Sequence, residues 1–227
     1  MISADAIIFD FDGVLLESEF EANVMLAELL TDLGHRHTPG EAIRHYTGLS
    51  GDDFIAAVER RIGTHLPPEF HDRMKEASIR ALKEGIEAVA GAVDFVRALP
   101  PDLRKAVASS SSTRWLRGHL DHLGLADVFG EHVYSGREHV TRGKPAPDIY
   151  LHAANQLGVE IGRSVILEDS EVGAIGALAS GASVIGLAAG RHCFDGHEEM
   201  LRAVGIAHVA HGFDEVARLL GLNQTSK

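Results

Sequence analysis

The sequence contains one cysteine, Cys193, among its 227 residues. A single cysteine cannot form an internal disulfide, so nothing points to an oxidising compartment. Basic residues are also few, since 21 lysines and arginines stand against 33 aspartates and glutamates, with a formal net charge of −12. Such a charge argues against a nucleic-acid partner, because phosphate backbones need a basic protein surface.

Two kinds of hydrophobic segment are missing as well. The N-terminus shows no basic stretch followed by an apolar run, so we expect no signal peptide. No run of 18 apolar residues occurs, so we expect no membrane span and no membrane partner. The 45% of hydrophobic residues is ordinary for a globular protein with a substantial core. We expect a cytoplasmic location and a monomer or weak homo-oligomer.

The most informative stretch is an apolar segment that contains two aspartates. Residues 6–11 predict a buried strand, and because side chains alternate along a strand, Asp10 and Asp12 point to the same side. Buried carboxylates are costly unless a cation or several donors compensate them. The stretch therefore predicts a hard cation such as Mg²⁺, with one carboxylate left for chemistry. The alternative is two solvated acids that cap a turn before Gly13.

Helical periodicity dominates the next 70 or so residues, and strands then alternate with helices. The helical segments behind the acidic strand are expected at residues 18–34, 40–46, 52–62 and 68–84. The later strands are expected at residues 104–108, 132–134, 164–167, 183–187 and 208–210. This order predicts an α/β fold with a doubly wound, mostly parallel sheet. We expect a core of residues 1–16 and 88–227, with an inserted α-helical cap domain at residues 17–87.

Polar residues follow three of the expected strands. They are Asp10 and Asp12 after the first, a serine run from Ser109 after the second, and Glu168 and Asp169 after the fourth. In doubly wound sheets, ligands lie beyond the carboxyl ends of the strands. If these strands are neighbours, four carboxylates meet at one edge, and they cannot all be ionised there without a cation.

Positive charge is available from Lys144, which lies in a proline-flanked loop just before a helix. A lysine in such a loop is more often an ordinary surface residue. Next to an acidic metal site, however, its charge would suit a phosphoryl group.

Together these motifs resemble the haloacid dehalogenase superfamily, in its branch of sugar-phosphate phosphatases and β-phosphoglucomutases. The resemblance is carried by Asp10-Phe11-Asp12-Gly13-Val14-Leu15, Ser109, Gly143-Lys144-Pro145-Ala146-Pro147-Asp148 and Glu168-Asp169-Ser170. It covers nearly the whole chain. It also implies that the helical insert is a mobile cap, with hinges near residues 15–17 and 84–90.

The resemblance implies a role for each acidic residue. Asp10 would be the nucleophile that forms an aspartyl-phosphate, and Asp12 would be the general acid and base. The family binds Mg²⁺ through the carboxylates of Asp10 and Asp169 and the backbone carbonyl of Asp12. Glu168 would lie in or beside this set of ligands.

The resemblance also implies the residues that hold the substrate. Ser109 would bind the transferring phosphoryl group, and Lys144 would neutralise its charge. Further contacts are expected from the backbone N–H groups of Phe11, Asp12 and Ser110 and from the cap loop at Gly48 and Ser50. Four basic residues of the cap are candidates for reaching the substrate: Arg44, Arg73, Lys75 and Arg80.

We therefore expect a phosphatase of a small phosphorylated metabolite such as a sugar phosphate. A β-phosphoglucomutase-type phosphomutase is the alternative, but such enzymes usually carry arginine where Gly51 stands and histidine where Ala22 stands. A non-catalytic sugar-phosphate binder is disfavoured, because neither Asp10 nor Asp12 has been lost. A metal-binding protein built on the 14 histidines is disfavoured by their spacing. We interpret the histidines as surface groups and Cys193 as a passive residue.

Overall fold

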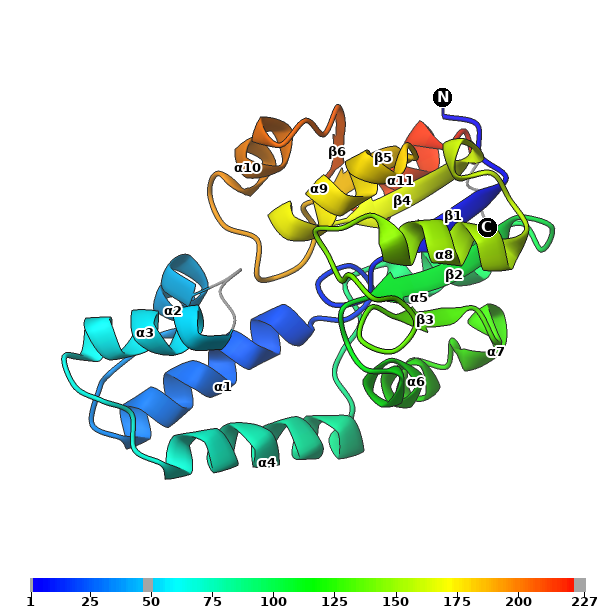
Figure 1. The fold of residues 1–227 in the computed structure, drawn as a ribbon. Helices are drawn as coiled ribbons and strands as arrows, with labels where there is room; N and C mark the ends of the chain where they lie inside the picture. The colour runs from blue at the N-terminus through cyan, green and yellow to red at the C-terminus, as the bar shows by residue number, and fades with distance from the viewer. Residues whose placement is uncertain (1, 47–50, 223–227) are drawn as a thin grey trace.

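The computed structural model describes residues 2–46 and 51–222. A six-stranded sheet, in the order β3-β2-β1-β4-β5-β6, lies at the centre of the core (Figure 1). The strands are β1 (Ala6–Phe9), β2 (Arg104–Ser109), β3 (Val133–Ser135), β4 (Ser164–Glu168), β5 (Ser183–Leu187) and β6 (His208–Ala210). All neighbouring pairs are parallel. The structure thus confirms the α/β fold with a doubly wound parallel sheet.

The acidic strand β1 lies in the middle of the sheet, between β2 and β4. Alternate residues face opposite layers, since Ile7 and Phe9 belong to one apolar cluster and Ile8 to the other. The strand ends at Phe9, two residues earlier than predicted. The reason is a tight loop, in which the carbonyl of Phe11 accepts the N–H groups of the residues four and five positions later.

Helices cover both faces of the sheet. One face is packed by α5 (Ala92–Ala98), α6 (Thr113–His122), α7 (Ala126–Phe129) and α11 (Phe213–Leu219). The other is packed by α8 (Asp148–Leu157), α9 (Glu171–Ser180) and α10 (His197–Ala203), with a short 3-10 helix at Ile161–Arg163. The short helices α7 and α10 were not predicted. Within the described residues, no helix is long and apolar enough to cross a membrane.

The insert after β1 consists of four helices, with no strand among its described residues. They are α1 (Ser18–Asp32), α2 (Pro39–Tyr46), α3 (Gly51–Ile62) and α4 (Glu69–Glu84). Figure 1 shows them to one side of the sheet. They have an apolar cluster of their own, formed by Leu26, Ala27, Leu29, Leu30, Ala42, Tyr46, Val58 and Phe70. This separate cluster supports the predicted cap at residues 17–87, whose limits stay a prediction.

The chain enters and leaves these helices through two linkers that lie side by side. The N–H of Glu17 donates to the carbonyl of Glu87 at 3.0 Å, and the N–H of Val89 donates to the carbonyl of Leu15 at 3.1 Å. Leu16 and Ala88 form an antiparallel bridge between the linkers. The helical insert is therefore joined to the core by one narrow, two-stranded neck.

Candidate active site

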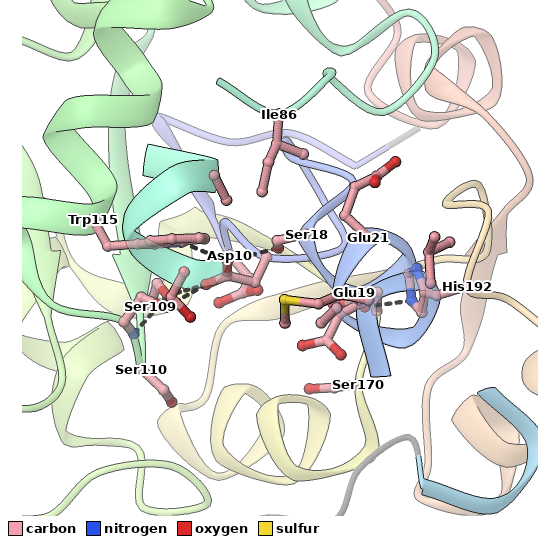
Figure 2. Close-up of a pocket in the computed structure, with 18 of the residues that line it drawn as sticks. Asp10, Ser18, Glu19, Glu21, Ile86, Ser109, Ser110, Trp115, Ser170 and His192 are labelled. Atoms are coloured by element: carbon pink, nitrogen blue, oxygen red, sulfur yellow. Dashed lines mark hydrogen bonds and ion pairs between the residues drawn. The ribbon is translucent and has the colours of Figure 1, made fainter. Parts of the chain in front are cut away.

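The carboxyl ends of β1, β2 and β4 meet at one edge of the sheet, as predicted. They open into a cavity of about 1020 Å³, lined on one side by the core and on the other by α1 and α4 of the insert (Figure 2). The residues predicted at the strand ends and in the lysine loop that line the cavity are Asp10, Asp12, Ser109, Ser110, Lys144 and Asp169. The cavity therefore contains groups from all four motifs.

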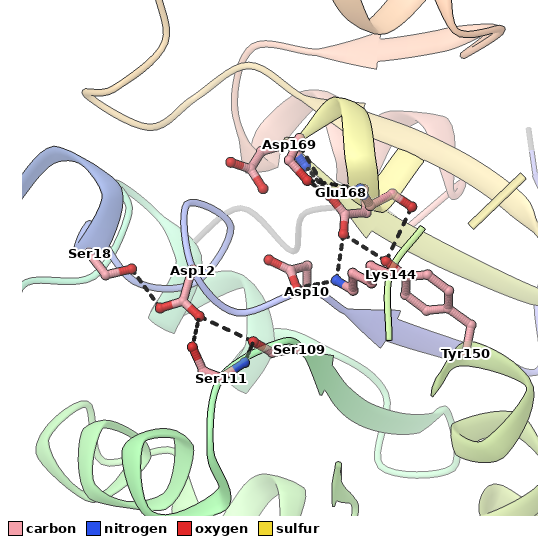
Figure 3. A network of polar contacts seen from close by, with 11 residues as sticks. Asp10, Asp12, Ser18, Ser109, Ser111, Lys144, Tyr150, Glu168 and Asp169 are labelled. Carbon is pink, nitrogen blue, oxygen red and sulfur yellow. Dashed lines mark hydrogen bonds and ion pairs between the residues drawn. The ribbon is translucent and has the colours of Figure 1, made fainter. Parts of the chain in front are cut away.

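Lys144 lies between two carboxylates at the base of this cavity (Figure 3). Its Nζ donates to Asp10 Oδ1 at 2.5 Å and to Glu168 Oε1 at 2.6 Å. The side chain of Lys144 is only 5% exposed, so it is not the ordinary surface lysine that its loop alone would suggest. Nζ also lies 4.9 Å from the ring centroid of Tyr150, whose hydroxyl donates to Glu168 at 2.7 Å.

Burial and charge act against each other on these groups. Burial raises the pKa of Asp10, and this effect outweighs the opposing effect of Lys144. Burial by itself would lower the pKa of Lys144, but the carboxylates of Asp10 and Glu168 raise it well above its usual range. Burial likewise opposes ionisation of Glu168, but Lys144 and further donors lower the pKa of that carboxyl. Lys144 therefore remains an ammonium, held between the carboxyl groups of Asp10 and Glu168.

Glu168 is held by donors on both of its oxygens. While Oε1 accepts from Lys144 and Tyr150, Oε2 accepts from the N–H of Asp169 and from the N–H and hydroxyl of Ser170, at 3.0 to 3.1 Å. A carboxylate with this many donors has little capacity left for a cation. The resemblance left open whether Glu168 binds Mg²⁺ itself or lies beside the residues that do. Its hydrogen bonds favour a place beside them.

Asp12 has a different environment, because four side chains donate to its carboxylate; Figure 3 shows the serines among them. The donors are the Ser18 hydroxyl at 2.7 Å, the Ser111 hydroxyl at 2.6 Å, the Ser109 hydroxyl at 3.1 Å and the Trp115 indole at 3.0 Å. Ser109 was predicted to bind phosphate, and in this structure it contacts Asp12. The other three donors were missed. Ser111 belongs to the serine run that the sequence shows after the second strand, whereas Ser18 and Trp115 carry no such signal.

Asp169 is oriented by two histidines. His192 Nε2 donates to Asp169 Oδ2 at 2.8 Å, and His197 Nε2 lies 2.8 Å from the backbone carbonyl of Asp169. Burial by itself would lower the pKa of His192, but its hydrogen bond to Asp169 raises it to about 11. The interpretation of all histidines as surface groups is therefore wrong for His192 and His197, and also for His119 in α6, which are all buried.

Cys193 is less isolated than the sequence suggested. Its Sγ lies 3.9 Å from His192 Nε2, and ligand-capable atoms of Cys193, His192 and His197 lie within 4.8 Å of one another. Burial would raise the pKa of this thiol, but the two histidines lower it to about 7. Because the Nε2 atoms of both histidines already contact Asp169, we interpret the group as support for that residue.

The residues at the cavity base fit a hard divalent cation. Carboxylate oxygens of Asp10, Glu168 and Asp169 lie within 4.8 Å of one another. Asp169 Oδ1 is buried and has no hydrogen-bond partner, and the Lys144 ammonium contacts only the carboxyl groups of Asp10 and Glu168. An all-oxygen donor set with an excess of negative charge is what Mg²⁺ prefers in proteins.

The other residues that were predicted to contact the substrate do not all lie at the cavity. The ring of Phe11 is buried in the core, so only its backbone is available to a substrate. Gly48 and Ser50 lie outside the described residues. Of the four basic cap residues, only Arg80 lines the cavity, and Arg73 is paired with Asp32 at 2.5 Å instead.

Curated relatives of this chain include phosphatases. The phosphorylated carbohydrates phosphatase of Thermotoga maritima is 30% identical over 189 residues, which are 78% of this chain and 82% of that protein. The 6-phosphogluconate phosphatase of Escherichia coli (strain K12) is 24% identical over 193 residues, which are 85% and 86% of the two chains.

Solved structures and the family comparison agree with these relatives. A HAD family hydrolase from Deinococcus radiodurans, crystallised with bound phosphate and sodium, is 32% identical, has a TM-score of 0.87, and 100% of each chain is covered. Residues 4–181 match the haloacid dehalogenase-like hydrolase family. This confirms the resemblance noted in the sequence, and the chain belongs to the haloacid dehalogenase-like hydrolase family.

Proposed function

We propose that this protein is a Mg²⁺-dependent phosphatase that hydrolyses a small phosphorylated metabolite, of the sugar-phosphate class, through an aspartyl-phosphate on Asp10. The phosphatase activities of the curated relatives support the reaction class. The observation that carries the proposal is that two neighbouring carboxyl groups, those of Asp10 and Asp12, have different hydrogen-bond partners. Asp10 contacts an ammonium at the cavity base, whereas Asp12 is fixed by neutral donors.

In the first step, an oxygen of Asp10 attacks phosphorus as the ester bond breaks. Asp12 gives a proton to the leaving oxygen, so the alcohol departs neutral. Lys144, already bonded to Asp10, stabilises the negative charge of the phosphoryl group. When bound, Mg²⁺ would be held by Asp10, Asp169 and the backbone of Asp12, and would supply further positive charge to the phosphoryl oxygens.

In the second step, Asp12 takes a proton from water, and the resulting hydroxide attacks the phosphorus of the aspartyl-phosphate. The bond between the Asp10 oxygen and phosphorus breaks, so that inorganic phosphate is released and the Asp10 carboxylate is regenerated. The same side chain thus acts first as acid and then as base. Its four donors hold the carboxylate of Asp12 in one orientation for both steps.

Ala22 favours a phosphatase over the phosphomutase alternative. It lines the cavity from α1, at the place where mutases of this branch usually carry a histidine. A methyl group can neither donate nor accept a proton there. Interconversion of β-glucose 1-phosphate and glucose 6-phosphate, assayed with a bisphosphate primer, would separate the two activities, and we expect phosphate release without interconversion.

The covalent mechanism is tested by Asp10→Asn. Phosphate release from a panel of sugar phosphates with Mg²⁺ is expected to fall about a thousandfold or more, because the amide is a poor nucleophile. The control is Asp5→Asn, which makes the same chemical change just before β1 at the opposite end of the strand, where Asp5 pairs with Arg163 at the surface. Turnover unchanged in Asp10→Asn would refute the covalent mechanism.

A further inference from the structure

The turn that follows β5 lies between the cap linkers and Asp169. It is closed by the N–H of Cys193, which donates to the carbonyl of Gly190 at 3.0 Å. Arg191 and His192 are therefore the two central residues of a single tight turn. Their side chains contact different parts of the molecule, and the turn connects those parts.

Arg191 contacts both linkers and the first helix of the insert. Its backbone N–H donates to the carboxylate of Glu17, at 3.2 and 2.9 Å from the two oxygens. Its guanidinium lies 3.0 Å from Glu21 in α1 and 3.4 Å from Glu87 in the second linker. It also lies 4.3 Å from the ring centroid of Phe20. Several contacts thus fix the position of Arg191 relative to the insert.

His192, which lines the cavity (Figure 2), connects the same turn to Asp169. Its side chain is 1% exposed. A Cβ on Gly190 would lie 2.5 Å from His192 Nδ1, and a Cβ on Gly13 would lie 2.1 Å from Asp169 Oδ2 and 2.9 Å from His192 Cε1. Two glycines therefore provide the space for this pair. An imidazole packed so closely cannot move independently of the turn that carries it.

We propose that this turn couples the cap to the metal site, with His192 as a positioning residue for the Asp169 carboxylate and Arg191 as the contact with the cap. The inference rests on the proposed Mg²⁺-dependent function, because it concerns a ligand of that site. A group that donates to a metal ligand fixes its orientation, and its loss typically costs about ten- to a hundredfold in metal affinity.

Coupling of this kind works in both directions. When the insert moves away, Arg191 loses its partners on α1, the turn shifts, and His192 no longer holds Asp169 Oδ2 in place. Mg²⁺ then binds less tightly to the open protein. By linkage, Mg²⁺ binding must favour the closed position of the cap by the same factor.

The test measures binding of Mg²⁺ alone to the full chain by isothermal titration calorimetry, without substrate. His192→Leu is expected to weaken binding by about ten- to a hundredfold, and His192→Gln, which keeps an N–H donor, should restore most of it. Arg191→Ala is expected to weaken binding about fivefold or more. Arg163→Ala is the matched control, because it removes a surface ion pair at the opposite end of the sheet, and it should bind Mg²⁺ as the parent does.

The double variant Arg191→Ala/His192→Leu distinguishes coupling from two separate effects. If the turn acts as one unit, the double variant binds Mg²⁺ no more weakly than His192→Leu alone. Equal affinities of Arg191→Ala and Arg163→Ala, or losses that multiply in the double variant, would overturn the coupling. Should His192→Leu not fold, the comparison of the two arginine variants still decides, because the Arg191 side chain is 43% exposed. A parent protein that binds no Mg²⁺ would instead contradict the proposed function.

Discussion

His119 in α6 is a fully buried residue whose two ring nitrogens have no hydrogen-bond partner. It lies behind the active site, with its ring 4.2 Å from the ring of Trp115. Burial lowers the pKa of His119 to about 4, against an ordinary value of 6.5, although Asp12 opposes the shift. The imidazole is therefore neutral in the folded protein at neutral pH and acts there as an apolar ring.

This burial predicts a loss of stability in mild acid. Between pH 6.5 and pH 4 the unfolded chain binds a proton at His119 that the folded protein does not, so the free energy of unfolding falls as the pH falls. From pH 7 to pH 5 the contribution is about 2 kcal/mol. Urea unfolding at both pH values should show a smaller loss in His119→Leu than in the parent. The exposed His208 supplies the control, and His208→Gln should leave the loss unchanged.

The residues that carry the chemistry were predictable to different degrees. Asp10 and Asp12 stand out because two acids in one apolar strand conflict with burial, and the local sequence shows that conflict. His192 and Trp115 do not stand out in this way. Their partners, Asp169 and Asp12, lie 23 and 103 residues away, and contacts of that kind follow from packing between elements, which periodicity does not reveal.

The helix α9 shows how tightly an element must fit its site. Gly173, in its first turn, lies against the carboxylate of Glu168, where a Cβ would lie 1.8 Å from Oε1 and 2.3 Å from Oε2. This carboxylate is fixed by Lys144, Tyr150 and Ser170, so it cannot move aside easily. The helix thus requires glycine here although glycine is a poor helix former.

Replacement of this glycine should reverse the usual effect of a glycine-to-alanine change in a helix. Gly173→Ala is expected to lower the free energy of unfolding by about 1–3 kcal/mol, because the methyl group overpacks the site. Gly40→Ala in α2 is the matched variant, since nothing lies within 4 Å of its Cβ, and it should be neutral or raise stability by up to about 1 kcal/mol. Chemical denaturation of both variants checks the pair. Equal effects would show that the Glu168 network yields to a methyl group.

At the scale of elements, the sequence predicted the strands well, because short apolar runs between glycines and polar residues leave little choice in a parallel sheet. It did not predict α7 and α10, of four and seven residues. Helices with so few residues give a weak periodic signal and form mainly through packing against the sheet, although α5 and α11 are also only seven residues long. The end of β1 was also misplaced. The loop that follows it is closed by its own hydrogen bonds, but its apolar residues continue the apolar pattern of the strand.

The whole molecule consists of two apolar layers around the sheet and a third apolar cluster within the insert. All buried members of the third cluster lie between Leu26 and Phe70. The two layers around the sheet contain none of these residues. The insert and the core are thus each stabilised by their own buried apolar residues, whereas the cavity is lined by residues of both.

This division predicts that the core folds without the insert. The Glu17–Glu87 hydrogen bond and the Leu16–Ala88 bridge place the linker ends side by side, so a two-residue Asn-Gly turn can replace residues 18–86 and close a hairpin. The shortened chain should unfold cooperatively in circular dichroism, because it keeps every buried member of both apolar layers of the sheet.

The shortened chain also keeps Asp10, Lys144 and Asp169. It should release phosphate slowly from an aryl phosphate, whose good leaving group needs little help from a general acid. Its preference among sugar phosphates should disappear, since α1 and α4, which line the cavity opposite the core, are gone. An aggregated or uncooperative product would contradict the division into core and cap, and retained sugar-phosphate selectivity would contradict the role of the insert.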